Sequence, residues 1–271
     1  EVVILKSAKH IISAVLALQL THTAAYADIT VKVNDRTIAM DSSPYISENN
    51  TLVPIRFIAE ALGCDVSWDS EEKKAQISNN ETNIVLFAES STAYVNNEKK
   101  TLGTKVSVKN NRTYVPLRFV AENMGADVHW DKENQSAIIY KGDIKVDLAY
   151  DEDELYWLAK IIHAEARGEV YEGKVAVGNV VLNRVADDYF PDTIYSVIFD
   201  RKNGVQFSPV ADGAINLEPS NESYYAADRA LNGESYVGNS LYFCNPEKST
   251  NTWIIKNRPF FTRIGTHNFY L

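Results

Sequence analysis

Residues 161–169 read Ile-Ile-His-Ala-Glu-Ala-Arg-Gly-Glu, and they close an amphipathic helix that the spacing predicts to begin near Asp153. Apolar residues recur at helical spacing, which places one stripe against a core; they are Leu155, Leu158, Ala159, Ile162 and Ala166. Gly168 is a typical stop after the last turn. Because Glu165 lies in that turn beside Ile162, we expect its carboxyl group to be partly buried at the floor of a cleft, with a raised pKa.

Glu169 follows Glu165 by four residues. A helix that continued this far would place both carboxylates on one face and would penalise their joint ionisation. The spacing alone does not make Glu165 catalytic, because most glutamates at helix ends are solvated or paired, and Arg167 is near. Further motifs are needed to assign it a role.

The segment from 153 to 271 predicts a mainly helical domain. After the first helix we expect a helix over 170–188, a short element over 194–199, a loop over 206–213, a helix over 223–231 that ends at Asn232-Gly233, a strand leading into a turn over 240–246, and a closing segment over 264–270. Acidic residues at 151–154 favour the positive end of a helix dipole, which places the domain boundary near residue 150. The junction over 142–152 has no long Pro/Gly/Ser linker, so we expect the two domains to sit close together.

An internal repeat organises the chain before this junction. Thr-Leu-Val-Pro-Ile-Arg-Phe-Ile-Ala-Glu-Ala-Leu-Gly at 51–63 matches Thr-Tyr-Val-Pro-Leu-Arg-Phe-Val-Ala-Glu-Asn-Met-Gly at 113–125, with an offset of 62 residues. The similarity extends over roughly 50 residues, which is too long to arise by chance. Each copy predicts an α+β unit. In the first copy we expect a strand over 29–33, a hairpin turn at Asn34-Asp35, a short helix from Pro54 to Gly63, and strands over 65–68 and 74–78 around a turn at Asp69.

These repeats carry the first resemblance to a known family. The first copy contains Val-Pro-Ile-Arg-Phe-Ile-Ala-Glu and Val-Ser-Trp-Asp, and the second copy matches both motifs in register. On these motifs, residues 28–141 resemble the copper amine oxidase N-terminal-like domain of secreted proteins from Gram-positive bacteria. The resemblance implies a stalk or wall-associated unit, and the family name does not imply bound copper. His129 is the only histidine of this region, so we expect no metal site there.

Three residues of each copy are candidates for sugar contacts; they are Arg56, Glu60 and Trp68 in the first and Arg118, Glu122 and Trp130 in the second. The alternative is that both Trp side chains belong to the core, while the Arg and Glu side chains, at i and i+4, form ion pairs on the helix surface. We favour this alternative, which makes the region a spacer or anchor.

The first 27 residues have the pattern of an export signal. Lys6 and Lys9 precede an apolar run over 11–20 that is too short to span a bilayer comfortably, and Ala25-Tyr26-Ala27 fits a cleavage site before Asp28. We therefore expect a secreted protein that meets the membrane only during export.

Charge and cysteine content exclude several classes of protein. The net charge of −9 divides into +1 over 1–27, −4 over 28–150 and −6 over 151–271, so a nucleic-acid binder is not expected. Cys64 and Cys244 are the only cysteines, which is too few for a disulfide framework or a cysteine-based zinc site. We expect both to be small buried residues.

Several motifs after residue 153, in this order, resemble the cell wall hydrolase family typified by the spore cortex-lytic enzyme SleB. They are Ala-Glu-Ala-Arg-Gly-Glu at 164–169, a helix over 176–184 that ends in Val-Leu-Asn-Arg, Phe-Ser-Pro-Val-Ala-Asp-Gly at 207–213, Leu-Tyr-Phe-Cys-Asn-Pro at 241–246, Trp253, and Gly-Thr-His-Asn-Phe at 265–269. The resemblance implies a lysozyme-like domain of the lytic transglycosylase type that acts on peptidoglycan glycan strands, with its catalytic glutamate at Glu165. The repeats replace the accessory module usual in that family, which leaves the choice between spore cortex and vegetative wall open.

Glycosidic cleavage needs an acid at the leaving oxygen. We expect Glu165 to protonate the bond between N-acetylmuramic acid and N-acetylglucosamine. As a carboxylate it would then take the proton of the muramoyl C6 hydroxyl, which attacks the anomeric carbon and leaves a 1,6-anhydro end. If water is the acceptor instead, Glu169 and Asp212 are the candidates for the second carboxylate of a hydrolytic muramidase. The alternative is a surface charge for Glu169 and a turn residue for Asp212.

The family motifs also supply candidate substrate-binding residues; they are Phe207, Ser208, Tyr242, Asn245, Trp253 and His267. Aromatic rings suit sugar faces, and Ser and Asn side chains suit hydroxyl and acetamido groups. Core packing is the alternative for the aromatic residues and turn formation is the alternative for Ser208 and Asn245. His267 either supports the site through a hydrogen bond or packs in the core.

Other wall-directed activities fit the sequence less well. A zinc amidase needs several ligands, and this domain offers only His267 and His163, which we interpret as structural. A Cys–His peptidase would need Cys244, whose apolar neighbour Phe243 disfavours a thiolate. A non-catalytic wall-binding protein stays open, because the repeats alone would support it.

The sequence therefore predicts an α+β protein: a signal peptide over 1–27, tandem strand/helix repeats over 28–141, and a mainly helical lysozyme-like catalytic domain over 153–271. We expect a monomeric, secreted, peptidoglycan-degrading enzyme with no cofactor, no metal and no nucleic-acid partner. Its expected location is the cell wall or spore cortex of a Gram-positive bacterium.

Overall fold

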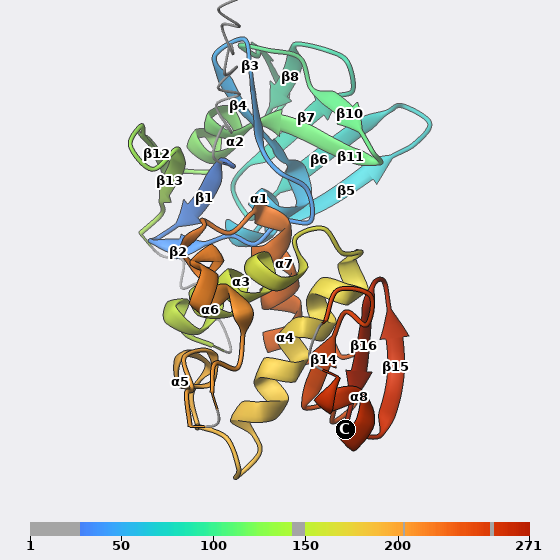
Figure 1. Ribbon diagram of the computed structural model, residues 1–271. Helices are drawn as coiled ribbons and strands as arrows, with labels where there is room; N and C mark the ends of the chain where they lie inside the picture. The colour runs from blue at the N-terminus through green and yellow to red at the C-terminus, as the bar shows by residue number, and fades with distance from the viewer. Residues whose placement is uncertain (1–27, 143–149, 203, 250–251) are drawn as a thin grey trace, which may run out of the picture.

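The computed structural model describes residues 28–142, 150–202, 204–249 and 252–271. The predicted signal peptide and most of the predicted junction lie outside the described residues. Strands dominate the first half of the chain and helices the second, and the two halves are stacked on one another (Figure 1). The predicted α+β fold class is confirmed.

The N-terminal half consists of short strands and two short helices; they are β1 Thr30–Val33, β2 Arg36–Thr37, β3 Tyr45–Ser47, β4 Asn50–Pro54, α1 Ile55–Ala61, β5 Asp65–Asp69, β6 Lys74–Ser78, β7 Asn83–Phe87, β8 Thr92–Val95, β9 Glu98–Thr101, β10 Ser107–Lys109, β11 Arg112–Pro116, α2 Leu117–Asn123, β12 Asp127–Asp131 and β13 Ser136–Tyr140. The strands form three sheets with the orders β12-β13-β1-β2, β10-β11-β4-β3 and β5-β6-β7-β8-β9. The predicted turn at Asn34-Asp35 is confirmed, since both residues have positive φ and join antiparallel strands.

The two repeats do not fold as separate units, although each alone predicts one. Strand β4 of the first copy pairs with β11 of the second, with Val53 opposite Val115. Strand β1 pairs in parallel with β13, with Val31 opposite Ala137. Both helices pack into one hydrophobic core, which contains Ile58 of α1 and residues of both copies. A unit of about 50 residues buries too little surface to be stable alone, which is a physical reason for the exchange.

The C-terminal half contains three longer helices, shorter helical turns and a small sheet; its elements are α3 Glu152–Ala166, α4 Tyr171–Val185, α5 Ile194–Ile198, α6 Ser208–Asp212, the 3₁₀ helix η1 Ala214–Asn216, α7 Asn221–Leu231, β14 Tyr242–Cys244, α8 Trp253–Asn257, β15 Phe260–Ile264 and β16 His267–Tyr270. Helices α3, α4 and α7 pack on one another around a second core. The antiparallel sheet β14-β16-β15 lies beside α4 (Figure 1).

Helix α3 begins and ends as its sequence predicts. Asp151 accepts a hydrogen bond from the backbone N–H of Glu154 at 2.7 Å, and the Glu154 carboxylate accepts one from the N–H of Asp151 at 3.1 Å. This capping box satisfies two N–H groups that the first turn leaves without a helical partner. The helix ends at Ala166, so it does not reach Glu169.

Helix α6 corrects the expectation of a loop over 206–213. Pro209 lies in its first turn, where a proline does not lose a helical hydrogen bond, and Gly213 ends it with a φ of 87°. Ser208 therefore begins this helix and Asp212 ends it. The composition of residues 206–213 is typical of a loop, so it did not indicate this single helical turn.

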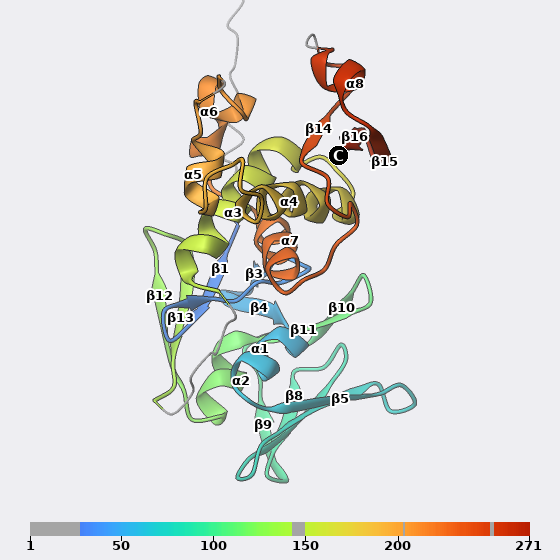
Figure 2. The same ribbon diagram turned by 90° about the horizontal axis from the view of Figure 1, so that it is seen from below.

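The two halves are joined by direct contacts, as the lack of a long linker predicts. The backbone N–H of Thr37 donates to the Glu152 carboxylate at 3.2 Å, and the Asn221 side chain donates to the carbonyl of Ile29 at 3.0 Å. The rings of Phe57 and Tyr225 meet edge to face, 5.9 Å apart. These contacts place the N-terminal end of α3 and the face of α7 against the strand domain, as both views show (Figures 1 and 2).

The expectation for the two cysteines can be compared directly with the structure. Cys64 and Cys244 are both free thiols and both buried, as predicted. Within the described residues, no helix combines the length and the apolar character that crossing a membrane requires.

Candidate active site

Glu165 lies in the last turn of α3 and is partly buried. Its neighbour Ala166 and Ile162, one turn earlier, are both in the core. Within the described residues, its carboxyl group has no hydrogen bond or ion pair that would hold it ionised. Burial, reinforced by the negative charge of Asp212, raises the pKa of Glu165 to about 7, while the charge of Arg184 opposes the rise. This carboxyl group can therefore carry a proton near neutral pH.

Asp212 is the second carboxylate whose charge acts on Glu165. It ends α6, is exposed, and accepts a hydrogen bond from the backbone N–H of Ala214 at 2.9 Å. The segment that follows it is fixed to α3 by the buried Lys160. The Lys160 ammonium donates to the carbonyls of Asn216 at 3.2 Å and Leu217 at 3.0 Å. The same helix therefore carries Glu165 and anchors the segment next to Asp212.

Arg184, on the last turn of α4, is a part of the site that the sequence did not single out. Its guanidinium group is buried and lies about 5 Å from the rings of Phe190 and Phe207. Its Nε donates to the carbonyl of Leu241 at 2.8 Å, but Nη1 is buried without a partner in the described residues. Burial lowers the pKa of Arg184 to about 10. The sequence did contain a signal for this residue. Arg184 falls on the same face of the helix as Val177 and Val181, which are buried, and a cation on a buried face is unusual.

Glu169 has a different environment from Glu165. Burial acts to raise its pKa, but hydrogen bonds from the backbone and hydroxyl of Thr266 outweigh burial and lower the pKa. The N–H of Thr266 donates at 2.8 Å. Gly265 makes this contact possible, because a Cβ on it would lie 2.0 Å from the Glu169 carboxylate. Glu169 thus links the segment after α3 to the turn between β15 and β16.

His267 and Asn245 belong to the same side of the domain as this link. His267 is buried, its ring packs edge to face on Phe243, and its Nδ1 lies 3.9 Å from the Glu169 carboxylate. Burial lowers the pKa of His267, which favours the neutral ring. Asn245 donates to the Thr266 hydroxyl at 3.0 Å and accepts from the N–H of Glu247 at 2.9 Å, so it supports two turns.

The remaining candidates divide between core and surface. Phe207 is fully buried and packs on Phe243 with their ring centroids 6.3 Å apart, as the packing alternative predicts. Tyr242 is half-buried and its hydroxyl accepts a hydrogen bond from Arg258 at 2.7 Å. Its ring lies 6.3 Å from that of Trp253, which is about half exposed. Ser208 is exposed at the start of α6.

The structure therefore brings some of these residues together and separates others. Glu165, Asp212 and Arg184 interact electrostatically, and Phe207 and Tyr242 both lie against Arg184. A second group, made up of Glu169, Asn245 and His267, forms around Thr266. His163, by contrast, accepts a hydrogen bond from the backbone of Ser220 at 3.3 Å, which is the structural role expected of it. In the described part of the chain, no three metal-binding side chains converge.

Comparison with known protein families gives two matches, which overlap over residues 168–186. The model of the copper amine oxidase N-terminal domain matches residues 32–139 and 108–186, and the model of the cell wall hydrolase matches residues 168–270. The second of these begins after Glu165, so the family match itself does not include that residue.

Relatives and solved structures match a little under half of this chain. The spore cortex-lytic enzyme of Oceanobacillus iheyensis is 42% identical over 126 residues, and that of Bacillus subtilis is 38% identical over 120 residues. These matches cover 46% and 44% of this chain but only 44% and 38% of the relatives, so the chain spans less than half the length of either. The catalytic domain of the germination-specific lytic transglycosylase SleB from Bacillus anthracis is 40% identical, with a TM-score of 0.42, and the match covers 46% of this chain and all of that one. The chain therefore carries a copper amine oxidase N-terminal domain followed by a cell wall hydrolase domain, and it belongs to the families that these two models describe.

Proposed function

We propose that the chain degrades peptidoglycan as a lytic transglycosylase, with Glu165 as its single acid and base. The observation that carries the proposal is the carboxyl group of Glu165, which has no hydrogen bond or ion pair within the described residues to hold it ionised and whose pKa burial raises to about 7. Such a group gives up a proton and takes it back near neutral pH, which is what one residue must do if it serves both steps. The match to the cell wall hydrolase model, which begins at residue 168, supports the class of substrate.

In the first step, protonated Glu165 donates its proton to the glycosidic oxygen between N-acetylmuramic acid and N-acetylglucosamine. The bond breaks as positive charge develops at the anomeric carbon. Glu165, now a carboxylate, takes the proton from the C6 hydroxyl of the same muramoyl residue, and that oxygen closes on the anomeric carbon. The product ends in 1,6-anhydromuramic acid, and Glu165 is protonated again.

Arg184 has a part in this cycle. After the first step, Glu165 is a buried anion, and the positive charge of Arg184 lowers the free energy of that state. Asp212 has the opposite effect, because its charge favours the protonated form that begins the cycle. The effect of Asp212 on the Glu165 pKa is the larger of the two, so the pair adds to the rise that burial causes.

One observation favours a second product chemistry. Because Asp212 is close enough to raise the pKa of Glu165, it is also the carboxylate that would activate water in a hydrolytic muramidase. Glu169 is a weaker choice, since Thr266 already binds its carboxylate. The muramidase would release reducing ends in place of anhydro ends.

The experiment is to digest purified peptidoglycan with the full chain and to identify the released muropeptides by mass spectrometry. We expect 1,6-anhydromuramic ends from the native chain and from Asp212→Asn, and a loss of release on the order of a thousandfold in Glu165→Gln. Glu172→Gln is the matched control, because Glu172 is an exposed carboxylate at the start of α4.

Each alternative has its own signature in this experiment. Reducing ends that disappear in Asp212→Asn would replace the transglycosylase by a muramidase. Undiminished release by Glu165→Gln would remove Glu165 from the chemistry. Binding to the wall without any release by the native chain would make it a wall-binding protein.

The same proposal places the protein outside the cell, in the wall or the spore cortex of a Gram-positive bacterium. The support for this location is the cell wall hydrolase domain and the spore cortex-lytic enzymes among the relatives. The predicted signal over residues 1–27 would supply the export route, and the proposed partner is the peptidoglycan glycan strand. A monomer without cofactor would suffice for this chemistry.

A further inference from the structure

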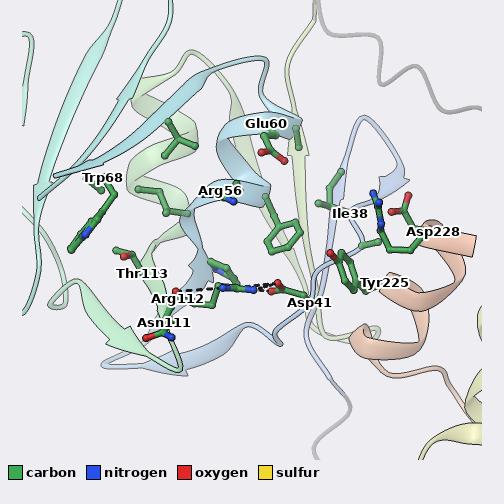
Figure 3. A pocket seen from close by; sticks show the side chains of 18 of the residues that line it. Ile38, Asp41, Arg56, Glu60, Trp68, Asn111, Arg112, Thr113, Tyr225 and Asp228 are labelled. Carbon is green, nitrogen blue, oxygen red and sulfur yellow. Dashed lines mark hydrogen bonds and ion pairs between the residues drawn. The ribbon is translucent and has the colours of Figure 1, made fainter. Parts of the chain in front are cut away.

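A cleft of about 770 Å³ lies in the N-terminal domain, on the side that faces α7. Figure 3 shows Trp68 of β5 at one end and Arg56 and Glu60 of α1 along one side. The hairpin of β10 and β11 forms the opposite side with Asn111 and Thr113, and Tyr225 of α7 closes the far end (Figure 3). The cleft is therefore built from both repeats and is closed by the hydrolase domain.

A second cleft, of about 250 Å³, repeats this construction with the two copies exchanged. Trp130 and Arg118 take the places of Trp68 and Arg56, and the hairpin of β3 and β4 takes the place of the hairpin of β10 and β11. Nine of the ten residues that line the second cleft have a counterpart, 62 positions away, that lines the first. The exception is His129, whose counterpart is Ser67. The correspondence follows from the internal repeat, which gives the domain two equivalent clefts.

Several lining residues are identical in the two copies, although Asn49 and Asn111 have a positive φ that itself favours Asn in a hairpin turn. Both copies keep Trp, Arg, Asn and Thr at equivalent positions of the two clefts. Trp68 is 46% exposed and Trp130 is 37% exposed, which corrects the expectation that the pair belongs to the core. An exposed indole that lines a cleft offers an apolar face against which a ligand ring can pack.

The polar groups around the first indole are partly free. Arg112 is paired with Asp41 and Arg229 with Glu234, so neither has its full charge available. Arg56 and Glu60 have no ion pair within the described residues, which corrects the expected helix-surface pair in this copy. In the second copy the expected pair is confirmed, because Arg118 contacts Glu122 at 3.0 Å. The larger cleft therefore offers one free guanidinium and one free carboxylate beside an exposed indole.

We propose that the two clefts bind the glycan strand of peptidoglycan, with the indole of Trp68 or Trp130 against the apolar face of a sugar ring. Asn and Thr of the facing hairpin bind acetamido and hydroxyl groups, and Arg56 binds the carboxylate of the muramic acid lactyl group. The inference rests on the proposed function, because the wall substrate is what identifies the saccharide. The net charge of −4 over residues 28–150 disfavours a densely anionic polymer as the ligand.

The two clefts differ in volume and in the domains that line them. A volume of about 770 Å³ accommodates an oligosaccharide, whereas about 250 Å³ accommodates part of one sugar. Since α7 lines only the first cleft, a strand bound there contacts both domains at once and is held next to the hydrolase domain. Two sites on one rigid domain also raise the affinity for a repeating polymer above that of either site.

The experiment measures binding by the full chain in a Glu165→Gln background, so that the ligand is not consumed. The probes are soluble oligosaccharides of alternating N-acetylglucosamine and N-acetylmuramic acid, neutral oligomers of N-acetylglucosamine, and purified sacculi with and without attached anionic polymers. Calorimetry gives Kd for the oligosaccharides and depletion gives it for the sacculi. The variants are Trp68→Ala with Trp130→Ala, the ring-keeping pair Trp68→Tyr with Trp130→Tyr, and Arg56→Met. Tyr94→Ala is the matched control, because Tyr94 is a half-buried aromatic residue of β8 in the same domain and lines neither cleft.

We expect the double Ala variant to raise Kd for both oligosaccharides about tenfold or more, with the Tyr pair restoring most of the affinity and the control unchanged. Arg56→Met should weaken only the muramic acid oligomer, and its exposed position leaves folding intact. Unchanged binding by the double Ala variant, with native unfolding behaviour, would overturn the proposal, as would binding that depends on the attached anionic polymers. The proposed function is tested by a separate measurement. It fails if the chain with native Glu165 releases no muropeptides.

Discussion

Replacing Glu165 by Gln should stabilise the folded chain, and by more at high pH than at low pH. Below pH 4.5, the ordinary value, Glu165 is protonated in both the folded and the unfolded chain, so its titration does not affect stability. Between pH 4.5 and about 7, the unfolded chain loses the proton while the folded chain keeps it. The folded state therefore binds more protons in this window, and the free energy of unfolding falls as pH rises.

The magnitude follows from the difference between the two pKa values. A rise from 4.5 to about 7 costs about 3 kcal/mol of folding free energy once the pH exceeds 7, and about 1 kcal/mol at pH 5. Gln has the same shape but no charge, so Glu165→Gln removes this cost. The variant should exceed the native chain in stability by about 1 kcal/mol at pH 5 and by about 3 kcal/mol at pH 8.

The assay is urea unfolding of the native chain and of Glu165→Gln at pH 5 and pH 8. The unfolding transition that Glu165→Gln shifts is assigned to the helical domain. Glu172→Gln serves as the control, because it removes an exposed carboxylate from the same domain. The reasoning fails if the advantage of Glu165→Gln is equal at both pH values or larger at pH 5. Either result would mean that the Glu165 carboxyl group ionises as easily in the folded chain as in water.

Two further predictions concern the charges and the turn near the site. Because the acid must be protonated to act, activity should be present below pH 7 and lost as the pH rises through about 7. Asp212→Asn removes a charge that raises the pKa of Glu165, so the pH–rate profile of muropeptide release should lose activity at a lower pH, and an unmoved profile would exclude the interaction. Gly265→Ala places a Cβ 2.0 Å from the Glu169 carboxylate at a residue with a φ of +57°, so it should lower stability by about 2–4 kcal/mol through backbone strain and the loss of hydrogen bonds to Thr266. Gly233→Ala carries only the backbone strain, since nothing lies within 4 Å, and an equal loss in both variants by thermal unfolding would refute the role of the Glu169 contact.

Local patterns were enough to predict the elements that depend on neighbouring residues. Helix α3 follows from its apolar stripe and its acidic first turn, and the position of Glu165 in its last turn follows from the same spacing. The burial that raises its pKa was predictable for the same reason, because Ile162 and Ala166 flank it on the buried face. These inferences need no knowledge of distant parts of the chain.

Contacts between distant residues were not predictable in this way. The two repeats have nearly the same strands, so their sequence does not specify whether β4 pairs within its own copy or with β11. The Glu169 contact joins residues 97 positions apart, and its only local signal is a Gly before Thr266. The exposure of Trp68 follows from the cleft that the other copy completes, which is why a preference for the core was wrong.

Glu165 and Glu169 are only four residues apart, yet their environments move their pKa values in opposite directions. The difference arises because α3 ends at Ala166 and Glu169 accepts hydrogen bonds from Thr266, whereas Glu165 has no hydrogen-bond donor in the part of the chain that the structure describes. A carboxyl group that stays protonated near neutrality can act as an acid, whereas one that two donors hold ionised serves as a structural anion. The end of one helix therefore assigns the two roles, and it leaves Asp212 as the carboxylate that can adjust the acid. If so, a variant that removes the Thr266 hydrogen bonds should change stability without moving the pH at which activity is lost.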